Sequence, residues 1–249
     1  MQIIYEDNHI IIVAKQSGEI VQGDKTGDTP LSETVKAYIK EKYQKPGAVF
    51  LGVVHRLDRP VSGLVVFART SKALSRLNDM FRKGEVHKTY WALVEGSNAG
   101  GQNDEWHVLE HWLTRNETQN KSYAYDREVP GSKKAMLKYR VIGHTDRYTL
   151  LEVNLMTGRH HQIRCQLSAM GHPIKGDLKY GAKRSNPDGS ISLLARRVEF
   201  VHPVSKENII VEAPLPENSL FGKVKTPTKP PQGEASDHSP LGETKGGRS

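Results

Sequence analysis

Two short apolar runs, at residues 49–54 and 64–68, constrain the fold of this chain more than any other feature. Both runs are rich in β-branched and aromatic side chains, which is typical of buried strands. Pro60 and Gly63 interrupt the pattern between them. We therefore expect two strands of one sheet, joined by an irregular loop or turn.

The loop between these runs carries one carboxylate, Asp58, with Arg56 two residues before it and Arg59 one residue after it. A neighbouring guanidinium keeps a carboxylate ionised at neutral pH. Asp58 is therefore either a surface aspartate that the adjacent arginines neutralise or a functional group. The rest of the chain has to decide between these interpretations.

The other segments alternate between strand patterns and helix patterns. Strands are predicted at residues 3–5, 10–15, 86–94, 135–142, 148–156, 192–200 and 208–212. Helices are predicted at residues 30–43, 70–83 and 157–170. A less regular β region follows residue 105, with expected core residues Trp106, Val108, Trp112 and Leu113, and residues 177–189 are expected to form an exposed loop.

This order of elements predicts one α+β domain, a mixed and mostly antiparallel central sheet with flanking helices and loops, over residues 1–222. After about residue 222 the chain is rich in Pro, Gly, Ser and Lys and almost free of apolar residues. Such a segment cannot bury enough surface to become ordered. Residues 223–249 are therefore expected to be a flexible tail.

The net charge of +8 favours a polyanionic partner. Residues 69–88 contain six Lys or Arg against two acidic residues, and residues 157–184 contain six against one. Each run is either a solvated face or part of one shared basic surface, on which counterion release from phosphates would supply most of the affinity. Because these runs flank the Asp58 and Tyr90 segments in sequence, we favour the shared surface.

The sequence also indicates a cellular compartment and argues against several classes of reaction. The single cysteine, Cys165, fits a reducing compartment, and no apolar run reaches the roughly 20 residues of a membrane helix, so we expect a cytoplasmic protein. The sequence has no metal-ligand spacing, no Gly-x-Ser-x-Gly elbow and no glycine fingerprint for nucleotide phosphates. His160 and His161 are adjacent and would point about 100° apart on a helix, which does not suit a shared metal.

Four phrases of the sequence point to one family. They are His55-Arg56-Leu57-Asp58 followed by Ser62-Gly63, Lys88-Thr89-Tyr90, Thr157-Gly158-Arg159-His160-His161-Gln162-Ile163-Arg164, and Gly171-His172-Pro173-Ile174-Lys175-Gly176-Asp177 with Tyr180-Gly181. In this order, over about residues 2–215, the chain resembles the RluA-type family of RNA pseudouridine synthases. It departs from the family pattern at Gln16, Pro60-Val61, His160 and Leu194.

The resemblance implies the pseudouridine synthase fold and isomerisation of specific uridines in structured RNA, ribosomal or transfer. It implies that Asp58 attacks the uridine, that Tyr90 lies against the uracil ring and takes part in late proton removal, and that Arg164 pairs with Asp58. Arg56 would fill the space that the flipped base leaves. The further residues expected to contact RNA are His55, Arg159, His161 and Lys175.

The resemblance also implies that neither a cofactor nor a metal is needed. We expect a monomer, and no N-terminal S4 RNA-binding domain, because the catalytic phrases start close to Met1. Two alternatives have to be weighed. A catalytically silent RNA-binding or RNA-chaperone protein of the same fold would have no need for a carboxylate that faces RNA, and a metal hydrolase would need clustered carboxylates near Asp58.

Overall fold

The computed structural model describes residues 1–97, 105–217 and 219–224. Within these ranges eleven strands form one sheet in the order β1-β2-β4-β10-β5-β9-β8-β6-β7, with β3 paired to β4 and β11 to β10. The strands are β1 (Gln2–Glu6), β2 (Ile10–Lys15), β3 (Gly52–Val53), β4 (Ser62–Ala68), β5 (His87–Glu95), β6 (His107–Asn116), β7 (Lys121–Tyr125), β8 (Lys133–His144), β9 (Tyr148–Leu155), β10 (Leu193–Val201) and β11 (Asn208–Glu212).

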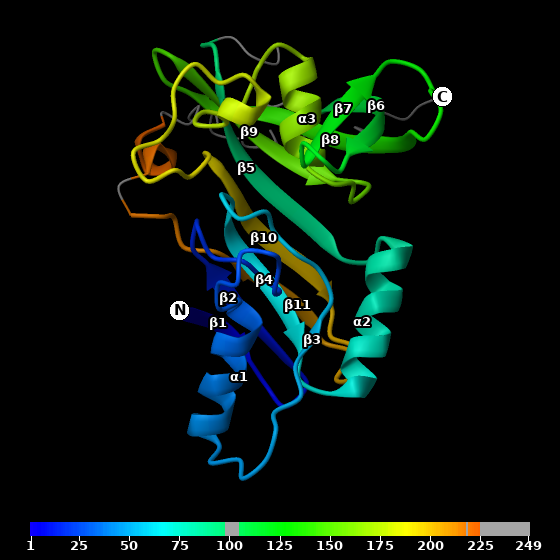
Figure 1. Ribbon diagram of the computed structural model, residues 1–249, viewed down its shortest axis with the longest axis vertical. Coiled ribbons are helices and arrows are strands. Elements are labelled where there is room, and N and C mark those ends of the chain that lie inside the picture. Colours follow the sequence, from blue (N-terminus) through cyan, green and yellow to red (C-terminus); the bar gives the residue numbers. More distant parts are fainter. Residues whose placement is uncertain (98–104, 218, 225–249) are drawn as a thin grey trace, which may run out of the picture.

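Three α-helices and two short 3₁₀ turns accompany the sheet. They are α1 (Leu31–Lys42), α2 (Ser71–Lys83), α3 (Gln162–Ala169), η1 (Leu178–Tyr180) and η2 (Leu220–Lys223). Figure 1 shows β5 and β10 passing through the middle of the molecule, with α1 and α2 beside one half of the sheet and α3 beside the other half. The predicted mixed, mostly antiparallel α+β architecture is confirmed.

The strands are antiparallel throughout the described sheet except where β4 meets β10. There Leu194 pairs with Ser62, and Ala195 pairs with Gly63. This parallel contact joins the N-terminal strands to the central strand pair directly after the loop that carries Asp58. It therefore fixes the position of that loop against the middle of the sheet.

Period-two alternation in β5 places its side chains as predicted. Tyr90, Ala92 and Val94 belong to one apolar cluster, and Leu93 belongs to the cluster on the other face. Both faces are covered because α1 packs on the first cluster and α2 on the second. Tyr90 consequently points to the same face as the Asp58 loop.

The ends of α2 follow the sequence signals. The Thr70 side chain accepts a hydrogen bond from the Ala73 N–H at 3.2 Å, and Gly84 ends the helix with a φ of 76°. α1 begins directly after Pro30, as the pattern indicates. Both helices were predictable because their apolar spacing agrees with a signal at the start, which is Pro30 for α1 and the Thr70 cap for α2.

Three predictions about local structure were wrong. The run at residues 49–54 forms only the two-residue strand β3. Trp106 and Val108 are exposed, at 39% and 57%, because the register of β6 turns Leu113 inward and the Trp106 ring lies against Arg140 instead of the core. Their hydrophobicity suggested burial, but only the alternation of the strand decides which side chains face inward.

The region after β9 also differs from the prediction. α3 begins at Gln162, whereas residues 157–161 form a loop. Residues 177–189 are not a wholly exposed loop, because Asp177 and Tyr180 are buried. The predicted tail lies outside the described residues except for Lys223 and Val224. None of the described helices combines the length and the apolar character needed to cross a membrane.

Candidate active site

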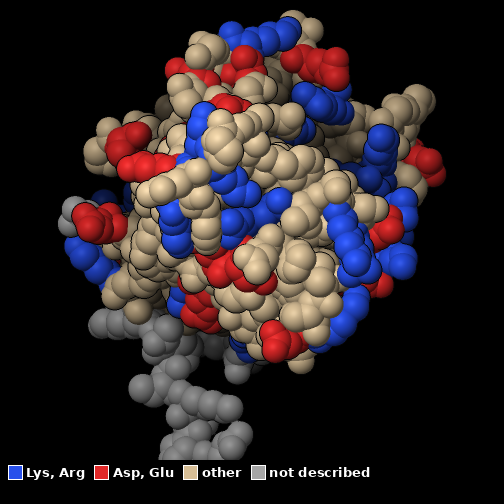
Figure 2. All heavy atoms as spheres, turned by 90° about the horizontal axis from the view of Figure 1, so that it is seen from below, with Lys and Arg blue, Asp and Glu red and all other residues tan. Residues whose placement is uncertain are grey.

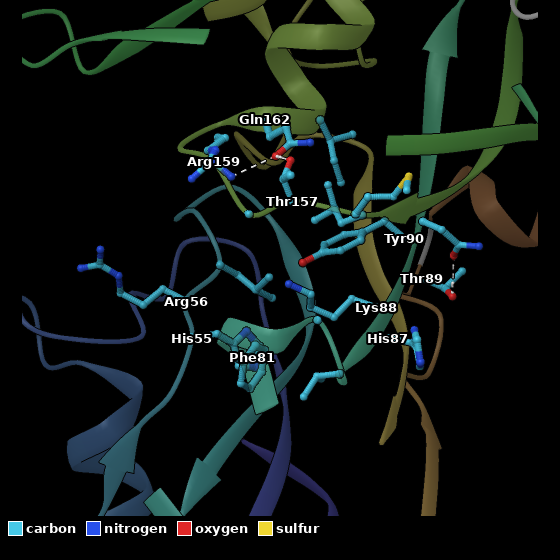
Figure 3. Close-up of a pocket in the computed structure, with 18 of the residues that line it drawn as sticks. His55, Arg56, Phe81, His87, Lys88, Thr89, Tyr90, Thr157, Arg159 and Gln162 are labelled. Atoms are coloured by element: carbon cyan, nitrogen blue, oxygen red, sulfur yellow. Dashed lines mark hydrogen bonds between the residues drawn. The ribbon is translucent and has the colours of Figure 1, made fainter. Parts of the chain in front are cut away.

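A cleft of about 1300 Å³ lies beside the loop that carries Asp58. Its walls come from that loop, the end of α2, the start of β5, the middle of β8, the end of β9, the segment that leads into α3, and residues of β6 and β10. In Figure 3 the Tyr90 ring projects into this space and Lys88 lies next to it, while Thr157, Arg159 and Gln162 line the opposite side. Segments far apart in the sequence thus meet at one place.

The Asp58 loop is held in place by a backbone hydrogen bond and by the side chain of Lys15. The Lys15 ammonium donates to the carbonyl oxygens of Gln16 at 2.9 Å, Arg59 at 3.1 Å and Val61 at 2.6 Å. The Val61 N–H donates to the Asp58 carbonyl at 3.0 Å, which closes the turn. Lys15 is therefore a structural part of the site, and no sequence pattern indicated this role.

The carboxylate of Asp58 pairs with Arg164 and not with its sequence neighbours. The Arg164 Nη1 donates to Asp58 Oδ2 at 3.0 Å. Arg59 forms an ion pair with Asp28 at 2.6 Å instead, and the Arg56 side chain is exposed. The interpretation of Asp58 as an aspartate neutralised by adjacent arginines is therefore wrong.

Arg164 is itself held by a second carboxylate. Its Nε donates to Asp177 Oδ2 at 2.7 Å and its Nη2 donates to Asp177 Oδ1 at 2.9 Å, while the Tyr180 ring lies 5.0 Å from the guanidinium carbon. Burial alone would lower the pKa of Arg164, but the hydrogen bonds and charge of Asp177 and then Asp58 raise it. The bidentate pair fixes the guanidinium so that Nη1 faces the cleft.

Tyr90 is 7% exposed on β5. Burial, and then the negative charge of Asp58, raises the pKa of its hydroxyl. Tyr90 therefore stays protonated at neutral pH. The structure brings together the three residues expected to be catalytic, from a loop, a strand and a helix.

The residues expected to contact RNA lie at different places. Arg56 and Arg159 line the cleft, and the Arg159 Nε donates to the Lys134 carbonyl at 3.0 Å. Lys175 does not line the cleft; its ammonium contacts Asn186 and lies 5.8 Å from the centre of the Tyr148 ring. Lys175 therefore lies outside the set of predicted site residues that line the cleft.

His55 lines the cleft, but its ring is engaged within the protein. Its Nε2 accepts the Val66 N–H at 3.0 Å, and the ring stacks on Phe81 with centroids 5.0 Å apart. Burial, and then the charge of Lys88, lowers the pKa of His55 to about 3. These contacts support the wall of the cleft, and an RNA contact by His55 remains a prediction.

His160 and His161 do not diverge as expected for neighbours on a helix. Both precede α3, His161 has a φ of 52°, and their rings stack with centroids 3.7 Å apart and planes 23° apart. His161 Nε2 lies 3.5 Å from Asp58 Oδ2. The two imidazoles therefore stack where the backbone of His161 is left-handed, with the His161 ring facing the carboxylate. A sequence pattern does not reveal such a conformation.

Asp177 and Tyr180 are the functional residues whose placement the sequence interpretation missed. Both belong to a phrase of the family pattern, yet their polar surroundings predicted an exposed loop. The available signal was the lone acidic residue in a strongly basic stretch. An arginine buried on α3 needs such a partner.

The cleft is predominantly basic. Three acidic residues line it, Asp58, Glu152 and Glu199, against nine cations, Arg56, Arg82, Lys83, Lys88, Arg115, Lys138, Arg159, Arg164 and Arg197. Figure 2 shows further Lys and Arg side chains in a band at the right, the side on which α2 lies in Figure 1, with Asp and Glu among them. The described residues contain no cluster of three or more His, Cys, Asp or Glu that could hold a metal ion.

Known proteins share this sequence pattern. The sequence model of the family described as RNA pseudouridylate synthase matches residues 9–169. The ribosomal large subunit pseudouridine synthase C of Vibrio cholerae is 34% identical over 219 residues, which are 86% of this chain and 65% of that protein. An uncharacterised RNA pseudouridine synthase of Bacillus subtilis, YhcT, is 33% identical over 87% of this chain and 69% of its own length.

Solved structures share the fold. Human RNA pseudouridylate synthase domain containing 4 aligns with a TM-score of 0.73 at 20% identity, over 91% of this chain and 95% of that one. Human RNA pseudouridylate synthase domain containing 1 gives 0.63 at 23% identity, over 86% and 83%. At these identities the likeness shows the fold, while the family model and the bacterial relatives show descent. The chain belongs to the RNA pseudouridylate synthase family, a family of isomerases that act on RNA.

Proposed function

We propose that this protein isomerises specific uridines of structured RNA to pseudouridine, with Asp58 as the nucleophile. The observation that carries the proposal is the pairing of Asp58 with a buried arginine, itself fixed by Asp177, at the floor of a basic cleft. The chain spans 65% to 69% of the length of the relatives named above. Because V. cholerae synthase C is named for the ribosomal large subunit, we propose ribosomal RNA as the first substrate to test.

The geometry supports a role for each of the three central residues. A base inside a helix has to be extruded before its ring can be reached, and Tyr90 offers a buried aromatic face next to Asp58 for the flipped base. Arg164 holds the carboxylate ionised and oriented for attack. Arg56 is exposed at the edge of the cleft, where it can enter the helix in place of the flipped base.

The chemistry that these groups have to perform is an isomerisation. The bond between ribose C1′ and uracil N1 breaks, a bond from C1′ to C5 forms, the C5 proton leaves, and N1 gains a proton. No electrons enter or leave. Tyr90 is protonated and interacts with Asp58, so we propose that it relays the C5 proton: its hydroxyl oxygen accepts that proton while its own proton passes to the Asp58 carboxylate, which is free again once C1′ is bonded to C5. The proposed catalytic unit is residues 1–222, acting as a cytoplasmic monomer.

Pseudouridine mapping of total RNA from cells with and without the gene tests this function. We expect at least one uridine to lose its modification in the deletion strain and to regain it with the wild-type gene, but not with Asp58→Asn. The control is Asp79→Asn, since Asp79 is an exposed residue of α2 that pairs with Arg82. If no site is lost, the silent RNA-binding alternative is favoured. Restoration of every site by Asp58→Asn would remove Asp58 from the mechanism.

A further inference from the structure

We infer that His161 is a positioning residue for Asp58, held by Tyr180 in the one tautomer that can donate to the carboxylate. The inference rests on the proposed role of Asp58 as the nucleophile. It departs from the expectation that His161 contacts RNA. Four observations carry it: the hydrogen bonds of Tyr180, the burial of His161, its backbone conformation, and the oxygen of Asp58 that it faces.

The hydrogen bonds around Tyr180 decide where the proton of His161 lies. The backbone N–H of Ser122 donates to the Tyr180 hydroxyl oxygen at 2.8 Å. The hydroxyl keeps its own proton to donate, and His161 Nδ1 lies 3.0 Å away. Nδ1 is then the acceptor, so that in a neutral ring the proton is on Nε2.

The surroundings of His161 keep the ring neutral. Burial, and then the positive charges of Arg164, His160, Lys179 and Arg115, lowers the pKa of His161 to about 2. The contact with Asp58 is therefore made by a neutral N–H donor and not by an imidazolium. This matters for the reaction, because a neutral donor orients the carboxylate without a second proton that could neutralise it.

The backbone and the neighbouring ring fix the orientation of the imidazole. A φ of 52° is uncommon for a residue other than glycine, although histidine adopts it more readily than most, and such a conformation is often found at functional sites where the surroundings enforce it. The His160 ring lies flat against the His161 ring, and Ser122 Oγ donates to the His160 carbonyl at 2.8 Å. The ring stack and the Tyr180 hydrogen bond together restrict the His161 ring to one orientation.

The oxygen that receives these donors indicates which oxygen reacts. His161 Nε2 lies 3.5 Å from Asp58 Oδ2, the same oxygen that accepts from Arg164 at 3.0 Å. No described residue hydrogen-bonds to Oδ1 of Asp58. A separation of 3.5 Å is long for a hydrogen bond, but catalytic contacts of this kind commonly shorten in the substrate complex. Two donors on Oδ2 leave Oδ1 to face the uridine.

Direct RNA contact by His161 fits the structure less well. The side chain is buried, Nδ1 of the ring is hydrogen-bonded to the Tyr180 hydroxyl, and Nε2 faces Asp58. RNA would have to displace these partners to reach either nitrogen. The positioning role and the RNA role therefore predict different effects on the reaction rate and on RNA affinity.

The test uses the full chain and total RNA from cells that lack the gene. A glutamine amide N–H can occupy the position of Nε2, whereas an asparagine amide N–H reaches only the position of Nδ1. We expect His161→Gln to stay within about tenfold of the wild-type single-turnover rate and His161→Asn to fall about a hundredfold, the size of effect seen when an oriented donor is removed. Asparagine tolerates a positive φ well, so backbone strain would not explain its deficit.

Tyr180→Phe removes only the hydroxyl and its two hydrogen bonds, from Ser122 and to His161. Because only the bond to His161 orients that ring, the rate should fall about tenfold, as expected for one orienting hydrogen bond. The matched control is Tyr139→Phe, because Tyr139 is also buried but its ring stacks on His107, whereas the Tyr180 hydroxyl contacts His161. RNA affinity of all these variants should match the wild type. A parallel loss of affinity and rate would overturn the positioning role in favour of RNA contact.

Nitrogen-15 NMR of the wild-type histidines supplies a readout that needs no activity or variant. We expect His161 to carry its proton on Nε2 at neutral pH; a proton on Nδ1, or on both nitrogens, would overturn the inference. Equal rates of the Gln and Asn variants would overturn it as well. Full activity of Asp58→Asn would instead overturn the proposed function, so the two failures are distinguishable.

Discussion

At the scale of single residues, the site is a row of alternating charges. Asp177 is 1% exposed and binds Arg164 through two hydrogen bonds, and Arg164 in turn holds Asp58, whose side chain is 30% exposed at the cleft. The inner carboxylate neutralises the arginine, while the outer one keeps a free edge toward solvent. The arginine thus orients Asp58 without depending on it for charge balance.

Replacing Asp177 by Asn tests this arrangement. The substitution leaves the buried Arg164 with an unpaired charge, so we expect the free energy of unfolding to fall by about 3–5 kcal/mol, as for other broken buried pairs. Urea denaturation checks the value, with Asp188→Asn at an exposed turn as the control. A loss below about 1 kcal/mol would contradict the buried pair.

At the scale of elements, the loop between β3 and β4 has almost no regular structure of its own. It is held by the ammonium of Lys15 at the end of β2 and by the parallel contact of β4 with β10. Loops that carry reactive groups are commonly fixed by the scaffold around them. The two supports can be tested separately.

Lys15→Met should give a pH-dependent change in stability. Burial lowers the pKa of Lys15 to about 8, whereas an unfolded lysine titrates near 10.5. Between these values the unfolded state binds more protons, so the wild-type free energy of unfolding rises with pH by up to about 3 kcal/mol. Lys15→Met lacks this rise.

Urea denaturation of both proteins at several pH values from 7.5 to about 10.5 measures the effect. The stability of the wild type relative to Lys15→Met should increase across this window. If the difference in the free energy of unfolding between the two proteins stays constant with pH, burial does not lower the pKa of Lys15. Enzyme activity should fall in Lys15→Met at every pH, because two carbonyl groups of the Asp58 loop, those of Arg59 and Val61, lose their donor.

Gly63→Ala tests the second support. Gly63 has a φ of 120°, and a Cβ atom there would lie 2.6 Å from the backbone nitrogen of Ala195. The β4–β10 contact would have to open, so we expect little folded protein in expression and circular dichroism experiments. Gly47→Ala is the control, since its Cβ would meet open space. A folded, active Gly63→Ala protein would contradict the described pairing.

Helices and strands were predicted well where two local signals agreed. They were predicted poorly where contacts with other strands decide which residues pair and which side chains are buried. α2 has a cap, an apolar stripe and a terminal glycine, and β5 combines a strand composition with side chains that point alternately to two buried faces. The run at residues 49–54 shrank to β3 because only Gly52 and Val53 meet β4. Hydrophobicity alone could not show that.

The candidate site, like the fold, was predictable only in part. The resemblance named Asp58, Tyr90 and Arg164 before any distance was available, and the structure places them together. The roles of Lys15 and Asp177 depend on contacts across 46 and 13 positions of the chain, which no local pattern contains.

At the scale of the whole molecule, cations from both halves of the sheet converge on one cleft. Arg82 and Lys83 come from α2, Arg115 from β6 and Lys138 from β8. A phosphate backbone lying across this opening would contact both halves. Binding should therefore depend strongly on ionic strength.

Arg115→Ala should weaken RNA binding about equally for all sequences and reduce the slope of log affinity against log salt by about 1. Binding titrations over a series of potassium chloride concentrations measure this slope. Lys36→Ala is the matched control, because Lys36 lies on α1 and pairs with Glu33 away from the cleft. Identical slopes for the two variants would place the RNA elsewhere.

If Asp58 is the nucleophile, single-turnover formation of pseudouridine by the purified protein should depend on its carboxylate. On total RNA from the deletion strain, Asp58→Asn should react at least about 10⁴-fold more slowly than wild type, as enzymes that lose their nucleophile do. Its RNA affinity and unfolding temperature should remain close to those of the wild type. A rate within tenfold of wild type would show that Asp58 is not the nucleophile.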